Sequence, residues 1–244
     1  MDFTLLWIAL IFLPAGMVKG VVGLGLPTIG MGLLALLMPP AEAAAMLALP
    51  SLVTNAWQML AGRRLGAIAR RLSPMMLGIC LGTWAGAGLM TGLSARYATA
   101  GLGGALVLYA IAGLTAFRFS VRASHEPVLS PIIGAITGMI TAATGVFVIP
   151  AVPYLQGIGL EKDALVQALG LSFTVSTLSL AASLAAGGVF VPTMIVPTIV
   201  SLGASLLGMW LGQIVRARLS PTTFRRFFFV GLLLLGAWLV VRAV

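Results

Sequence analysis

The chain has 244 residues, of which 60% are hydrophobic and only 8% are charged, and its mean hydropathy is +1.14. Soluble domains carry about 25% charged residues, so this composition excludes a soluble globular fold. The polar residues stand in short groups between apolar runs, most of them about 18 to 25 residues long, the length that crosses a bilayer core. The composition therefore predicts an all-α integral membrane protein with several spans.

The formal net charge is +9, from 14 Lys or Arg against 5 Asp or Glu. The basic residues stand at the ends of apolar runs, where they act as orientation signals, so no nucleic-acid partner is predicted. The single cysteine, Cys80, excludes an internal disulfide, and the single histidine, His125, stands in a polar loop. Without a group of convergent ligands, neither a metal site nor a cofactor is predicted.

The apolar runs cover residues 3–22, 24–38, 43–61, 73–92, 98–118, 129–142, 145–158, 164–186, 190–215 and 223–243. The first run is predicted to be kept as a membrane segment, because Asp2 stands where a secretory signal carries Lys or Arg. Runs 24–38, 129–142 and 145–158 are short for a spanning helix at ~1.5 Å per residue. We interpret them as short tilted helices or halves of re-entrant hairpins, and expect about 8 to 10 membrane segments.

Charge placement predicts the orientation of the segments. Loop 62–72 holds the densest group of basic residues, namely Arg63, Arg64, Arg70 and Arg71. The positive-inside rule places this loop in the cytoplasm, and Arg118 then falls on the same side two crossings later. An even number of crossings between residues 129 and 158 keeps Arg216, Arg218, Arg225 and Arg226 inside as well. The rule thus favours a hairpin in that segment.

The chain also repeats itself. The matches are Gly16-x-x-Lys19-Gly20 with Gly134-x-x-Thr137-Gly138, Ala41-Glu42-Ala43 with Lys162-Asp163-Ala164, Gly82-x-Trp84-x-Gly86 with Gly208-x-Trp210-x-Gly212, and Leu93-Ser94 with Leu219-Ser220. The separation of matching residues rises only from 118 (Gly16 to Gly134) to 126 (Gly82 to Gly208). We therefore predict two homologous membrane repeats, 1–118 and 129–244, joined by a cytoplasmic linker at 119–128. A hairpin in each half would make them inverted repeats.

Breaks near the start of each half are candidates for a binding site. Secondary transporters built from inverted repeats bind substrate where broken helices meet near the midplane. Here we expect breaks at Gly23 to Pro27 and at Thr141 to Gly145, and N–H groups freed at a half-helix N-terminus favour an anion. Lys19 is the one ionisable residue well inside an apolar run, where no acid stands beside it, so a bound anion would be its partner. The alternative is that Lys19 snorkels to the interface.

Polar side chains recur at helical spacing in both halves, on Ser51, Thr54, Asn55 and Gln58, and on Ser172, Ser176 and Ser179. Such a face lines a polar cavity or bonds a neighbouring helix, and its presence in both halves favours the cavity. We interpret Gly82, Gly86, Gly208 and Gly212 as helix-packing residues. The predicted substrate-binding residues are Lys19, Gly23, Gly25, Thr28, Ser51, Asn55, Gln58, Thr137, Thr141, Thr144, Gly145, Ser172 and Ser176.

The order of these features resembles that of the TauE/SafE family of sulfite and organosulfur anion permeases. The resemblance rests on a glycine-rich break, a turn at Met38-Pro39-Pro40-Ala41-Glu42-Ala43, a small-polar helix and a glycine-rich helix ending in Leu-Ser, all duplicated. It covers nearly the whole chain. Gly23-Leu24-Gly25-Leu26-Pro27 stands where the family commonly has a longer glycine run, and the second half has Thr144-Gly145-Val146-Phe147. The resemblance implies a small membrane transporter of sulfite, sulfoacetate or a related anion.

The sequence thus predicts a multi-pass inner-membrane secondary transporter that moves sulfite or a small organosulfonate by alternating access around two helix breaks. An anion channel or an accessory membrane subunit is the alternative. An intramembrane enzyme is disfavoured, because no Ser/His pair, carboxylate pair or metal-ligand cluster stands within the apolar runs. The expected partners are the small anion and the lipid bilayer, and a homo-oligomer is compatible with the sequence.

Overall fold

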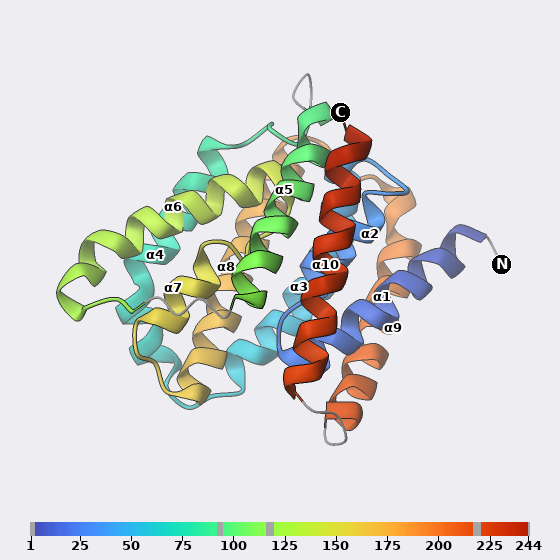
Figure 1. Ribbon diagram of the computed structural model, residues 1–244. Coiled ribbons are helices and arrows are strands. Elements are labelled where there is room, and N and C mark those ends of the chain that lie inside the picture. Colours follow the sequence, from blue (N-terminus) through green and yellow to red (C-terminus); the bar gives the residue numbers. More distant parts are fainter. Residues whose placement is uncertain (1–2, 92–94, 116–119, 217–220, 244) are drawn as a thin grey trace.

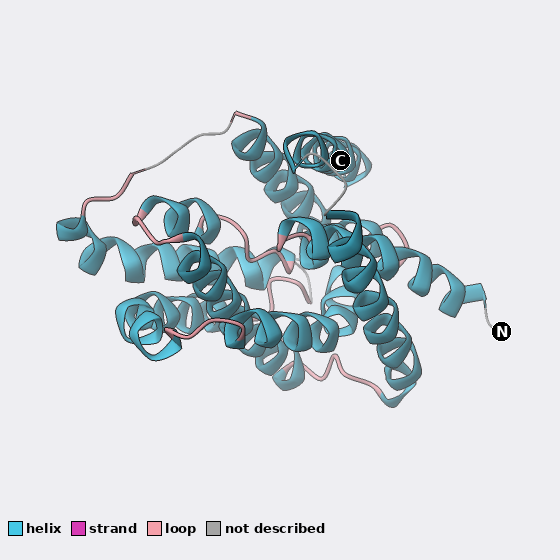
Figure 2. Cartoon of the chain, turned by 90° about the horizontal axis from the view of Figure 1, so that it is seen from below, coloured by secondary structure: helices cyan, strands magenta, loops and turns pink. Residues whose placement is uncertain are grey.

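A computed structural model of the chain describes residues 3–91, 95–115, 120–216 and 221–243 (Figure 1). Residues used above that lie outside this part are Asp2, Leu93, Ser94, Arg118, Arg218, Leu219 and Ser220. Every regular element in the described part is helical, and Figure 2 shows no strand there. The prediction of an all-α chain is confirmed for these residues.

The helices follow the same order twice. The first series is α1 (Phe3–Val22), α2 (Leu26–Leu34), α3 (Pro40–Leu60), α4 (Leu65–Ala85) and α5 (Ala95–Leu114). The second series is α6 (Glu126–Thr144), α7 (Ala151–Gly157), α8 (Lys162–Ala186), α9 (Ile195–Arg216) and α10 (Pro221–Ala243), with short 3-10 turns at Ala123–His125 and Pro192–Met194. Each series has one long, one short and three long helices.

Two predicted boundaries are wrong. Helix α4 begins at Leu65, well before the predicted run at 73–92, so Arg70 and Arg71 lie on the helix and not in a loop. A hydropathy run ends at a charge, whereas a helix continues past it when the side chain reaches a polar partner or water. Helix α6 has 19 residues and is therefore longer than the predicted run at 129–142.

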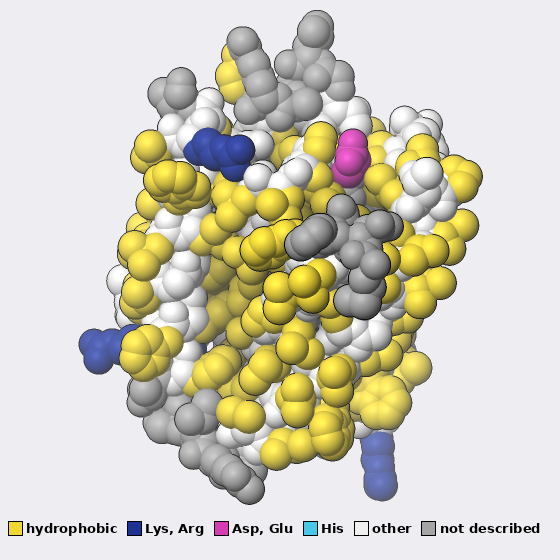
Figure 3. Space-filling view, turned by 90° about the vertical axis from the view of Figure 1, so that its right-hand side faces the viewer, with side chains coloured by type: hydrophobic (Ala, Val, Ile, Leu, Met, Phe, Trp, Pro, Cys, Tyr) yellow, Lys and Arg dark blue, Asp and Glu magenta, His cyan; other side chains and the backbone are white. Residues whose placement is uncertain are grey.

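The outer surface is that of a multi-pass membrane protein. The segments long and apolar enough to cross a bilayer are Leu5–Val22, Tyr97–Leu114, Ala123–Thr144, Lys162–Ala186, Pro192–Arg216 and Phe224–Ala243. Large apolar side chains point outward, among them Phe227 at 75% and Val241 at 72% exposure. Figure 3 shows a face covered mostly by hydrophobic side chains, with the few visible charged side chains towards its edges. Such a surface suits lipid and not water.

The two series of helices are interleaved. The most extensive contacts are those of α1 with α9, α4 with α6, α5 with α10 and α3 with α8. Figure 1 shows α4 and α6 together on the left, α1 and α9 on the right, and α5 beside α10 in front. Each pair joins a helix of the first series to one of the second, so neither series forms a separate unit.

Glycines allow two of these pairs to pack backbone against backbone. A Cβ atom on Gly82 of α4 would lie 2.0 Å from the Ala135 carbonyl oxygen of α6, and one on Gly208 of α9 would lie 2.1 Å from the Leu13 carbonyl oxygen of α1. The glycines in this position on the four helices are Gly16, Gly20, Gly78, Gly82, Gly134, Gly138, Gly208 and Gly212. Small residues permit such close approach in membrane proteins. The packing interpretation is therefore confirmed for Gly82, Gly208 and Gly212.

We expect Gly82→Ala and Gly208→Ala each to lower the free energy of unfolding by about 1–3 kcal/mol, because the added methyl group has no space. Gly104→Ala and Gly203→Ala are matched controls, since a Cβ atom on either of these helical glycines meets nothing within 4 Å. The controls should not lower stability, because alanine is favoured over glycine in the middle of a helix by roughly 0.5–1 kcal/mol. Thermal unfolding of the purified protein in detergent measures the difference, and equal losses in all four variants would contradict the packing argument.

Candidate functional site

The first helix break lies where the sequence predicts it. Helix α1 ends at Val22, and Gly23 and Gly25 then take left-handed backbone conformations with φ of 79° and 119°. This conformation costs other L-residues roughly 1–2 kcal/mol, which explains the glycines. Helix α2 starts at Leu26, with Pro27 in its first turn, and the Thr28 hydroxyl donates to the Gly25 carbonyl at 3.0 Å.

The second break also combines a left-handed glycine with a threonine hydroxyl, but here the threonine comes before the glycine. Helix α6 ends at Thr144, and Gly145 caps it with φ of 72°. The Thr144 hydroxyl accepts a hydrogen bond from the Val146 N–H at 3.2 Å and donates to the Ile140 carbonyl at 2.7 Å. The chain then runs without helix to Ala151, where α7 begins. The predicted break at Thr141 to Gly145 is therefore correct only at Gly145, because α6 continues through Thr144 and the break extends from Gly145 to Pro150.

Lys19 is buried in the protein interior. It lies on α1, is only 4% exposed, and its ammonium group donates to the Asn55 side-chain oxygen on α3. The Asn55 amide nitrogen donates to the Thr177 hydroxyl on α8 at 3.4 Å. The burial excludes the snorkelling alternative. Asn55 is a neutral partner and no described carboxylate forms an ion pair with Lys19, so its charge is not neutralised among the described residues.

One small cavity lies between the first turn of α2, α3, the second break and α8, and neither Lys19 nor the serines of α8 line it. Its lining includes Pro27 of α2, Ser51 of α3, Gly145 of the second break and Thr177 of α8. A Cβ atom on Gly145 would lie 2.7 Å from the Met31 methyl carbon of α2, so the second break touches the short helix of the first series. The cavity is therefore built jointly by parts of the chain that are far apart in sequence.

Several serine hydroxyls near this region are buried without a hydrogen-bond partner among the described residues. They are Ser51 of α3 and Ser172, Ser176 and Ser179 of α8. A buried hydroxyl left unpaired costs about 1–3 kcal/mol, and native structures contain few of them. A hydroxyl can donate to an anion's oxygen. These hydroxyls are thus available to a ligand.

Other predicted site residues have local partners or lie elsewhere. The Thr137 and Thr141 hydroxyls donate to the Ile133 and Thr137 carbonyls of their own helix, both at 2.7 Å, and neither residue lines the cavity. A Cβ atom on Gly23 would meet nothing within 4 Å. Gln58 donates to the Val166 carbonyl at 3.1 Å near the end of α3 and does not line the cavity.

Two buried polar residues are absent from the predicted set. Thr177 follows Ser176 and so leaves the serine stripe by one helical step, although it lines the cavity. Gln167 is 1% exposed, donates to the Met59 and Gly62 carbonyls at 2.7 and 2.9 Å, and accepts from the Arg64 N–H at 3.2 Å. A lone carboxamide inside an apolar run is the sequence signal that could have identified it.

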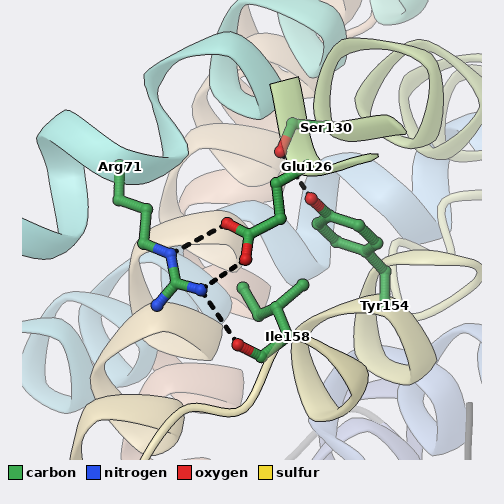
Figure 4. Close-up of polar contacts among 5 residues, drawn as sticks. All are labelled: Arg71, Glu126, Ser130, Tyr154 and Ile158. Carbon is green, nitrogen blue, oxygen red and sulfur yellow. Dashed lines mark hydrogen bonds and ion pairs between the residues drawn. The ribbon is translucent and has the colours of Figure 1, made fainter. Parts of the chain in front are cut away.

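An arginine joins the two ends of the segment that holds the second break (Figure 4). Arg71 of α4 donates to the Glu126 carboxylate at 2.6 and 2.9 Å, and to the Ile158 carbonyl at 2.9 Å. Nearby, the Ser130 and Tyr154 hydroxyls are 2.5 Å apart and tie α6 to α7. The segment from 126 to 158 therefore begins and ends beside the same guanidinium group.

A family model described as Sulfite exporter TauE/SafE matches residues 8–239, nearly the whole chain and both breaks. No curated protein and no solved structure matches the chain. The family match confirms the resemblance seen in the sequence.

The contact between Lys19 and Asn55 can be tested through stability. Asn55→Leu should lower the free energy of unfolding by about 1.5–3 kcal/mol, because the buried ammonium group loses its acceptor. Lys19→Met should remove most of that penalty, so the double variant should be more stable than Asn55→Leu alone. Thermal unfolding in detergent gives the coupling energy. Strictly additive losses would show that the two side chains do not depend on each other.

Proposed function

Because the chain belongs to the Sulfite exporter TauE/SafE family, a family of membrane transporters for sulfite and organosulfur anions, we propose that it moves sulfite or a small organosulfonate across an inner membrane by alternating access. The observation that carries this proposal is the cavity bordered by the first turn of α2, by the second helix break, and by Ser51 and Thr177 on the facing polar helices. Broken helices that meet in this way hold the substrate in other secondary transporters.

The chemistry of the region suits an anion with several acceptor oxygens. Lys19 supplies a positive charge that no described carboxylate neutralises, and the unpaired hydroxyls of Ser51, Ser172 and Ser176 supply donors. An anion would replace Asn55 as the partner of Lys19. No described group of His, Cys, Asp and Glu could hold a metal ion, and the proposal requires none.

Helix directions support inverted repeats of residues 1–118 and 129–244, joined by the linker at 119–128. Residues at the start of α3 and residues just after the end of α8 line the same hollow. At the other end of the pair, Gln58 near the end of α3 donates to the carbonyl of Val166 near the start of α8. These equivalent helices are therefore antiparallel. Helices α5 and α10 are antiparallel too, since Gly103 contacts Val240 and Gly113 contacts Phe229. Inversion requires this relation between equivalent helices.

The polar contacts of Arg71 support a hairpin in the second half. Because Glu126 and Ile158 contact the same side chain, α6 and α7 leave one end of the molecule and return to it. Basic residues of the α3–α4 turn and of the end of α9 line a common groove at that end. By the positive-inside rule, we propose that this end faces the cytoplasm.

Lys19→Met should weaken binding of sulfite by at least about tenfold, which corresponds to ~1.4 kcal/mol, because the site loses its only buried cationic side chain among the described residues. Titration of the purified protein with sulfite measures the change, and uptake into proteoliposomes should fall in parallel. Arg226→Met, which removes an exposed charge, is the control. Unchanged affinity in a folded Lys19→Met protein would remove Lys19 from the site, and uptake that does not saturate would indicate a channel.

The proposed topology predicts which positions face outward. In a Cys80→Ala background, Ser124→Cys and Gln156→Cys should resist a membrane-impermeant thiol reagent added to intact cells, because both lie beside the hairpin ends that Arg71 joins. Thr193→Cys, exposed in the α8–α9 connection, should react. Labelling at Gln156→Cys with protection at Ser124→Cys would mean that the segment crosses the membrane once.

A further inference from the structure

A polar groove opens at the end of the molecule that we assign to the cytoplasm. It lies between the α3–α4 turn, the start of α8 and the end of α9, and its volume is about 610 Å³. We name it the basic groove, after its charged lining residues Arg63, Arg64, Glu161, Lys162, Asp163 and Arg216. It shares no lining residue with the cavity between the helix breaks, so it is a separate feature of the molecule.

The charges of the groove are unbalanced. Four basic and two acidic side chains line it, a net charge of +2. Arg64 forms an ion pair with Glu161 at 3.3 Å, whereas none of Arg63, Lys162 and Arg216 forms an ion pair with a described residue. A hollow of about 660 Å³ at the opposite end has Glu42 as its charged lining residue and no basic one. The two openings therefore differ in the sign of their charge.

Polar side chains of α3 lie between the floor of the groove and Lys19. Gln58 lines the groove, is 9% exposed, and lies one helical turn after Asn55, the partner of Lys19. Gln58 and Gln167 bond across α3 and α8, Gln58 to the Val166 carbonyl at 3.1 Å and Gln167 to the Met59 carbonyl at 2.7 Å. These bonds hold the end of α3 to the start of α8.

We propose that the basic groove is the cytoplasmic mouth of the transport pathway, where the substrate anion gathers before it passes Gln58 to reach Lys19. This inference rests on the proposed function. A cleft lined by one sign of charge raises the local concentration of an oppositely charged solute and its association rate. The groove should therefore lower the KM for an anion taken from the cytoplasmic side, while the acidic opening gives no such advantage on the other side.

Orientation signals alone do not explain this arrangement. The positive-inside rule requires basic residues on one side of the membrane but no common location among them. Here, residues from the α3–α4 turn, from α8 and from α9 meet around a single polar floor made by Gln58 and Gln167. An anion pathway requires basic side chains that gather in this way at the entrance that leads to a buried cation.

The experiment compares two double variants of the full chain in inside-out membrane vesicles, with sulfite as the transported probe. Arg63→Gln/Arg216→Gln removes two charges of the groove. Arg225→Gln/Arg226→Gln removes two exposed charges of α10 that do not line it. At low ionic strength, the groove variant should raise the KM about tenfold with little change in the maximal rate. Near 1 M salt, where the screening length is about 3 Å, the difference should largely vanish.

The α10 variant should keep the wild-type KM within about twofold. In right-side-out vesicles, the KM of the groove variant should equal that of the wild type. A wild-type KM in the groove variant, with uptake still dependent on Lys19, would overturn this inference and leave the proposed function in place. Equal KM increases in both variants would assign the effect to general surface charge and overturn it too. Absence of sulfite transport by the wild type would overturn both.

Discussion

A helix that breaks inside an apolar protein leaves backbone N–H and C=O groups that must find partners, because neither lipid nor an apolar core supplies them. The rest of this structure depends on how the chain meets that requirement twice. Thr28 bonds the Gly25 carbonyl and Thr144 bonds the Val146 N–H beside the two breaks. The far ends of the short helices depend on arginines from the other part of the chain.

Those arginines bond carbonyl groups at the ends of the short helices and so attach these helices to distant parts of the fold. Arg242 of α10 donates to the Leu36 carbonyl just after α2, at 3.1 Å, and Arg71 of α4 donates to the Ile158 carbonyl that ends α7, at 2.9 Å. A cation also interacts favourably with the negative end of a helix dipole. Each short helix is thus held by a long helix from the opposite half of the sequence. Each break is therefore stabilised by a contact between the two halves.

The sequence predicts what depends on local pattern. The position of the first break, the start of the second at Gly145, and the close packing of Gly82 and Gly208 follow from glycine chemistry. The sequence prediction fails where the structure of a residue depends on a partner far away in the chain. The sequence predicts Arg71 in a loop, because hydropathy cannot show that its side chain bonds to the Glu126 carboxylate from a position on α4. The polar spacing of Thr137 and Thr141 resembles a cavity lining, yet their hydroxyls are used within α6.

The helix packing also limits which parts can move if access alternates as proposed. Glycine contacts lock α1 to α9 and α4 to α6, with carbonyl oxygens 2.0 to 2.3 Å from the positions that Cβ atoms would occupy. Each locked pair mixes the two halves, so the halves cannot rock against each other without separating close-packed backbones. The contacts between α3 and α8 are of two kinds. A Cβ atom on Gly170 of α8 would lie 2.4 Å from the Met59 nitrogen of α3, so the backbones are close-packed there too, while the long side chains of Gln58 and Gln167 bond across the two helices. Side chains of this type can exchange partners at modest cost, because each lost hydrogen bond contributes only about 0.5–1.5 kcal/mol net when water or a ligand replaces the partner. The hydrogen bonds of Gln58 and Gln167 can therefore change without separating the close-packed backbones, and Gln58 lies one helical turn from Asn55, the partner of Lys19.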